Sequence, residues 1–121
     1  MVERRLSDGV RIAELLASEL AGHGGRLADV EPVDADPDAE PSADGTFAYA
    51  VERGDRRIAT VHVHPDRARI VFRDDPAAAA AAARERGLRT RRVAADPPRT
   101  LVFVEDGAAV KRALRTVEAV A

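Results

Sequence analysis

The first apolar pattern along the chain repeats every three or four residues between residues 6 and 20. Its members are Leu6, Val10, Ala13, Leu16, Ala17 and Leu20. This spacing predicts an amphipathic helix with one face turned to a core. Ser7 or Asp8 is suited to cap its start, and Gly22 follows its last apolar position. We therefore expect an N-terminal helix that ends near Gly22.

The next part of the chain shows the two-residue alternation of β-strands. A weak strand is expected within 26–33, a second contains Phe47, Tyr49 and Val51, and a third covers about 56–64. In the third strand, one face carries Ala59, Val61 and Val63, and the other carries Thr60, His62 and His64. The fourth strand would bury Ile70 and Phe72 and turn Arg69 and Arg73 to water. Turns at Gly54-Asp55 and Pro65-Asp66 connect these strands as antiparallel neighbours.

The last third of the chain predicts two more helices around two strands. Asp75-Pro76 is a helix start, because Asp caps well and Pro suits the first helical position. The alanine run 77–83 continues this helix up to Gly87. A short arginine-rich strand is expected over 88–94. The continuously apolar segment 101–104 predicts a central strand buried on both faces, and Asp106 caps the final helix.

The resulting element order is α-β-β-β-β-α-β-β-α. Helices before and after a run of strands predict an α+β fold, a two-layer sandwich with a mainly antiparallel sheet and three helices. The length of 121 residues suits one domain, 1–121. The segment 34–45 carries Pro37, Pro41 and several carboxylates, and we expect it to be a mobile acidic loop.

Charge is segregated along the chain although the net charge is only −2. Seven carboxylates and no Lys or Arg lie within 29–44, whereas six arginines and two carboxylates lie within 84–99. The chain has no cysteine, which excludes disulfides and thiolate metal sites. No apolar run is long enough to span a bilayer, and residues 6–9 interrupt any signal-peptide pattern. We therefore expect a cytoplasmic protein without membrane contact.

The arginine-rich segment is the candidate anion site, with Arg89, Arg91, Arg92 and Arg99 as its residues. Guanidinium groups bind phosphate in a bidentate, charge-assisted manner. Single-strand binding modules usually add aromatic side chains for base stacking. Here all three Phe and the one Tyr fall at expected core positions. The pattern therefore predicts weak, non-specific polyanion binding at most. The alternatives are a solvated edge strand that blocks aggregation, or pairing with the acidic loop.

His62 and His64 lie two residues apart on one strand face, a workable spacing for two metal ligands. The run 62–66 resembles the start of the HxHxDH signature of metallo-hydrolases, but position 67 is Arg instead of His. We therefore expect no metal and no cofactor. A small metal-dependent enzyme using these two histidines is kept as an alternative.

Five segments together resemble a known family. They are 6–9, 11–19, 34–38, 64–67 and, most strongly, 97–113. They resemble a family of short, uncharacterised proteins from haloarchaea, a likeness that covers most of the chain. The resemblance implies no activity and no site residue. The element order is also similar to that of small α+β proteins of the MmcQ/YjbR type.

The sequence does not specify a biochemical function. The leading interpretation is a small, non-catalytic binding or interaction domain, because no nucleophile–base pair and no complete ligand cluster is present. The alternatives are an anion or nucleic-acid binder using the arginines, and the metal-dependent enzyme. A homodimer is an open alternative for the assembly, because alanine makes up much of the apolar content and the core is small.

Overall fold

The computed structural model describes residues 8–22, 27 and 29–121. Within this part, three helices and six strands follow one another in the predicted order. In chain order they are α1 (Gly9–Gly22), β1 (Val30–Val33), β2 (Thr46–Arg53), β3 (Arg56–Val63), β4 (Ala68–Phe72), α2 (Pro76–Glu85), β5 (Arg89–Val93), β6 (Arg99–Val104) and α3 (Gly107–Val120). This confirms the α+β prediction. The predicted helical positions before residue 8 lie outside the described residues.

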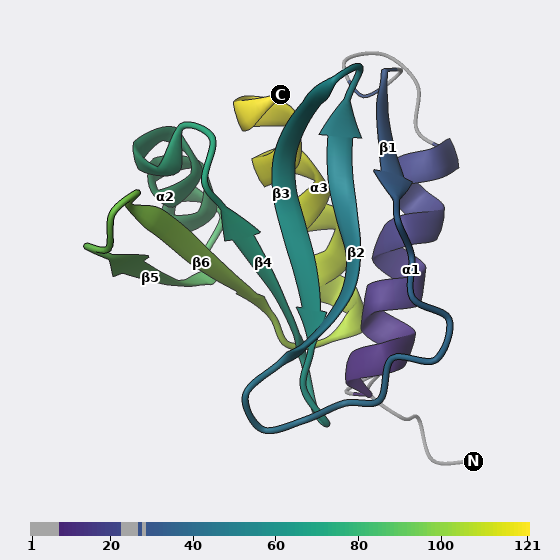
Figure 1. Cartoon of the computed structure of the whole chain (residues 1–121). Coiled ribbons are helices and arrows are strands. Elements are labelled where there is room, and N and C mark those ends of the chain that lie inside the picture. The colour runs from purple at the N-terminus through teal and green to yellow at the C-terminus, as the bar shows by residue number, and fades with distance from the viewer. Residues whose placement is uncertain (1–7, 23–26, 28) are drawn as a thin grey trace.

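The six strands form one antiparallel sheet with the order β1-β2-β3-β4-β6-β5 (Figure 1). Successive strands are neighbours from β1 to β4. The chain then leaves the sheet through α2 and returns as β5 at the far edge, so that β6 lies between β5 and β4. This crossover brings the arginine-rich strand β5 and the strand β4 to either side of β6.

One hydrophobic core lies between the sheet and the three helices. The alternate strand residues that face it include Val61, Ile70, Phe72 and Val102, all at most 1% exposed. The helices contribute one apolar stripe each, such as Ile12 and Leu16 in α1. In α2, the buried side chains are all alanines, which allows this helix to pack closely. No helix in the described part of the chain has the length and apolarity that crossing a bilayer requires.

Aspartate side chains cap the starts of the helices. The Asp8 carboxylate accepts hydrogen bonds from the backbone N–H groups of Val10 and Arg11, at 3.0 and 3.3 Å. Asp75 and Asp106 accept from residues three positions further on, Ala78 and Ala109. These bonds satisfy N–H groups that have no partner within the helix. The predicted caps at Asp8, Asp75 and Asp106 are therefore confirmed.

The prediction that segment 101–104 is buried on both faces is wrong. Val102 and Val104 are fully buried, but Leu101 and Phe103 are partly exposed. The reason is that the described helices belong to one core on one side of the sheet. An apolar residue on the other side therefore remains at the surface, although the run of four apolar residues resembles a buried strand.

The acidic segment 34–45 connects β1 to β2 and passes below the ends of β2 and β3 in the view of Figure 1. Two of its backbone N–H groups bind strands: Asp36 N–H donates to Ala48 O at 2.8 Å, and Ser42 N–H donates to Val63 O at 3.4 Å. The backbone oxygens of Ala43 and Asp44 are also hydrogen-bonded, to the side chains of His64 and Arg69. The segment is a loop, as predicted. Its mobility stays a prediction.

Candidate functional site

The open face is the side of the sheet that points away from the core. Residues directly opposite each other on neighbouring strands share a face, so the strand register identifies its members. One row across five strands consists of Phe47, His62, Arg69, Phe103 and Arg89. A second row consists of Ala50, Thr60, Val71, Leu101 and Arg91. Arginines and apolar side chains thus share one face of the sheet.

A hollow of about 350 Å³ lies on the open face where β3, β4, β6 and β5 meet. Its lining consists of His62, Arg69, Val71, Arg73, Arg91, Val93, Arg99 and Leu101. Four of these eight residues are arginines, and no carboxylate lines the hollow in the described part of the chain. Cationic side chains thus outnumber the three apolar ones, Val71, Val93 and Leu101, which is the chemistry of an anion site rather than of a hydrophobic pocket.

The arginines of the hollow lack acidic partners. Among the described residues, no carboxylate lies within 4.0 Å of the guanidinium groups of Arg73, Arg91 or Arg99. Arg69 donates from its Nη1 to the backbone oxygen of Asp44 at 3.2 Å, while its Nε is buried without a hydrogen-bond partner. A buried donor without an acceptor is unfavourable, so an acceptor supplied by a ligand would stabilise this site.

The pKa shifts show the same excess of positive charge. Burial lowers the pKa of Arg69 first, and the neighbouring charges of Arg67 and Arg99 lower it further, against the opposing effect of Asp44. Burial lowers the pKa of His62 to about 4, and Arg69, His64 and Arg73 add to that shift. His62 is therefore neutral near pH 7.

Two aromatic side chains expected in the core lie on the open face instead. Phe47 is partly exposed and meets His62 edge-to-face, with 5.9 Å between ring centres. Phe103 is contacted by two guanidinium groups, those of Arg67 at 5.6 Å and Arg89 at 5.4 Å from its ring centre. Cations over ring faces are attracted by the quadrupole of the ring. Of the four aromatic residues, only Tyr49 and Phe72 belong to the core.

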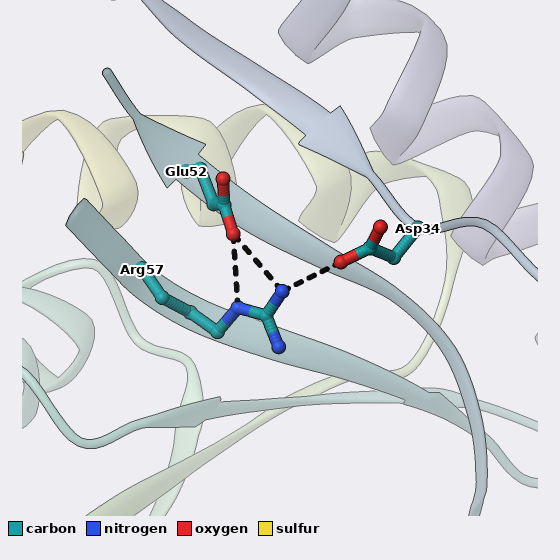
Figure 2. Close-up of polar contacts among 3 residues, drawn as sticks. All are labelled: Asp34, Glu52 and Arg57. Carbon is teal, nitrogen blue, oxygen red and sulfur yellow. Dashed lines mark hydrogen bonds and ion pairs between the residues drawn. The ribbon is translucent and has the colours of Figure 1, made fainter. Parts of the chain in front are cut away.

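The opposite end of the open face, over β1 to β3, carries neutralised charge (Figure 2). There Arg57 donates through Nε and Nη2 to the carboxylate of Glu52, at 3.1 and 2.9 Å, and through Nη2 to Asp34 at 2.6 Å. The hydrogen bond with Glu52 is the main cause that raises the pKa of Arg57. Arg57 thus pairs with two carboxylates, whereas the arginines that line the hollow form no ion pair with a described residue.

The four arginines predicted from the sequence are divided by the structure. Arg89, Arg91 and Arg99 lie on the open face, since they pair in register with Phe103, Leu101 and Val93. Arg92 lies on the other side of β5, because it pairs with the buried Thr100. Arg69 and Arg73 were expected to face water but not to join this site. The missing information was the pairing of β4 with β6, which strand periodicity does not reveal.

The two histidines do not form a common site with a carboxylate in the described structure. His62 lines the hollow, and its Nε2 lies 3.0 Å from Thr60 Oγ1. His64 is buried, and its Nδ1 lies 3.0 Å from the backbone oxygen of Ala43. The described residues contain no group of three or more His, Cys, Asp or Glu side chains arranged to hold a metal ion. The geometry thus lends no support to the metal-dependent alternative.

Comparison with known proteins places the chain in one family. Residues 1–121, the whole sequence, match the family of unknown function DUF7993. The chain belongs to that family. No curated protein and no solved structure is significantly similar to it.

Proposed function

We propose that this DUF7993 protein is a non-catalytic binding domain that holds a phosphate-bearing polyanion on the open face of its sheet. The observation that carries the proposal is the hollow, which four arginines line without a carboxylate among the described residues. Arg91 and Arg99 extend from β5 and β6, and Arg69 extends from β4. Three strands thus direct to one place guanidinium groups that form no ion pair with a described residue.

The chemistry of the hollow suits an oxyanion such as phosphate. A guanidinium group presents two parallel N–H donors that match two oxygens of one phosphate. Several such groups on one rigid sheet suit a ligand with several phosphates in a row. Binding to such a ligand releases counterions, so the affinity should fall steeply with salt concentration.

Neighbouring arginines on β5 provide a matched test. Arg91 lines the hollow and Arg92 lies on the other side of the strand, and both side chains are exposed. We expect Arg91→Gln to weaken binding of inorganic polyphosphate several-fold, measured by calorimetry at low salt, and to reduce the salt dependence of that binding. Arg92→Gln, with the same change of charge, should leave both quantities unchanged.

Two results would contradict the proposal. One is the absence of polyphosphate binding by the unaltered protein at low salt. The other is an equal loss of affinity in the two variants, which would assign binding to the general charge of the chain instead of the open face.

Compartment, source and assembly are also proposals. The absence of cysteine supports a cytoplasmic location. The segments quoted above support a haloarchaeal source, and the element order supports a likeness to the MmcQ/YjbR type. The small core supports a homodimer, which light scattering of the purified protein would test directly.

A further inference from the structure

The aromatic groups on the open face suggest which polyanion it binds. Phosphate needs only the arginines, yet Phe47 and Phe103 lie partly exposed in the same cross-strand row as Arg69 and Arg89. We infer, on the basis of the proposed function, that the ligand is single-stranded nucleic acid. Its bases stack on the rings of Phe47 and Phe103, and its phosphates pair with the arginines around the hollow.

The row that contains Phe47 and Phe103 places an arginine, Arg69, between the two rings. Phe47 and Phe103 are separated by two strands, β3 and β4, which carry His62 and Arg69 between the two rings. Three strand spacings correspond to roughly 14 Å. A backbone that links two stacked bases therefore passes the Arg69 guanidinium, whose Nε has no hydrogen-bond partner among the described residues. Burial, and then the charges of Arg67 and Arg99, lower the pKa of this group.

Arg67 and Arg89 already lie over the ring of Phe103, at 5.6 and 5.4 Å, and a base must displace one of them or stack on it. Arg89 is the one that is easier to displace. The side chain of Arg89 is 69% exposed, and its ion pair with Glu105 is long, at 3.5 Å. An exposed pair of this kind is weak. When a base displaces Arg89, the ring of Phe103 loses its contact with the guanidinium and gains a larger stacking contact with the base. The guanidinium is then free to pair with a phosphate.

The geometry favours a single strand over a duplex. Reading the major groove of a duplex requires a helix or a two-stranded ribbon that enters it. The described helices pack on the other side of the sheet, and the open face is a broad surface with a hollow. Antiparallel sheets that carry aromatic residues on an open face stack unpaired bases in this way.

The test compares ligands with and without bases. Labelled single-stranded oligonucleotides, deoxy and ribo, are titrated into the full chain beside an abasic strand of equal length and inorganic polyphosphate. Binding is followed by fluorescence anisotropy, with polyphosphate as an unlabelled competitor. We expect the base-bearing strands to bind about tenfold more tightly than the abasic strand, in line with the free energy of stacking on an aromatic ring. The ratio of the affinities for the ribo and deoxy strands shows whether the protein prefers RNA or DNA.

Variants without an aromatic ring show which side chains cause the difference in affinity between base-bearing and abasic strands. Phe103→Leu and Phe47→Leu keep an apolar side chain but remove the ring, so each should lower affinity for base-bearing strands several-fold. Affinity for the abasic strand and polyphosphate should not change. Leu15→Ala is the control, because Leu15 is an exposed apolar side chain on α1, away from the open face. The melting temperature of each variant verifies that it is folded.

The remaining outcomes distinguish failure of the nucleic-acid inference from failure of the proposed polyanion site. Equal affinity for base-bearing and abasic strands, unchanged in the ring variants, overturns the inference and leaves the proposed polyanion site standing. If neither polyphosphate nor any strand binds at low salt, both proposals are wrong. If polyglutamate binds as tightly as the oligonucleotides and depends equally on Phe103, the partner is an acidic protein segment and the inference is again overturned.

Discussion

Arg69 on β4 and Phe103 on β6 stand directly opposite each other on the open face of the sheet. A cation and a ring from distant segments of the sequence thus become neighbours on one surface. The cause is the path of the chain, which leaves β4 through α2 and β5 before β6 returns to pair with β4. The candidate site depends on this pairing more than on the local sequence of either strand.

The first prediction compares two phenylalanines on neighbouring strands. Phe72 is fully buried, and Phe72→Ala should lower the free energy of unfolding by about 3–5 kcal/mol, the usual cost for a buried Phe. Phe103 is half-buried on the open face, so Phe103→Ala should cost only about 1 kcal/mol. Denaturant titrations of both variants measure the difference. Equal losses would mean that the open face is covered in solution.

The second prediction concerns two glycines at the ends of α1. A Cβ atom on Gly9 would collide with the backbone oxygen of His64, whereas one on Gly22 would meet nothing within 4 Å. Because backbone cannot move aside cheaply, Gly9→Ala should destabilise the protein by about 2 kcal/mol or more. Gly22→Ala should be neutral or slightly stabilising. Similar melting temperatures for the two variants would contradict the close contact between α1 and the turn after β3.

Strand periodicity was sufficient to predict which residues of β3 and β4 face the core. Val61, Val63 and Ile70 are buried as expected, and His62 and Arg69 lie on the other side. Alternation is a local property of the chain, so it can be recognised without knowing the partner strand. The order of elements followed from the same local signals.

The apolar pattern was misleading where burial depends on whether helices cover that face of the sheet. In β6, Leu101 and Phe103 are as apolar as their buried neighbours, and nothing local distinguishes an uncovered face from a covered one. The site was predicted in part for the same reason. The sequence indicated Arg89, Arg91 and Arg99, which lie on the open face, and also Arg92, which does not; the pairing of β4 with β6 that adds Arg69 is a non-local contact.

The third prediction uses the single tyrosine of the chain. The Tyr49 hydroxyl is buried and donates to the backbone oxygen of Ala13 at 2.8 Å, which joins β2 to α1. Tyr49→Phe should lower the free energy of unfolding by about 1 kcal/mol, the net value of one such hydrogen bond. Burial also raises the pKa of Tyr49.

With one Tyr and no Trp in the sequence, an absorbance titration reports this group alone. Tyrosinate should therefore appear only together with alkaline unfolding. Ionisation near the ordinary tyrosine pKa in a folded sample would show that the hydroxyl reaches solvent and that the contact with α1 is absent.

The last prediction concerns the pH dependence that His62 contributes to stability. The pKa of His62 is lowered from 6.5 to about 4, mainly by burial and then by Arg69, so the folded protein takes up this proton less readily than the unfolded chain. The stabilisation is therefore complete above about pH 6.5 and is lost progressively as the pH falls toward 4. Because the ring is about half-buried and solvent screens it, we expect a total effect of about 1–2 kcal/mol. The free energy of unfolding should fall more steeply between pH 6.5 and 4.5 in the unaltered protein than in His62→Gln, in which the other titrating groups are retained. Parallel curves, or an NMR titration of the His62 ring with a midpoint near 6.5, would show that neither burial nor the arginines of the hollow lower the pKa of this residue.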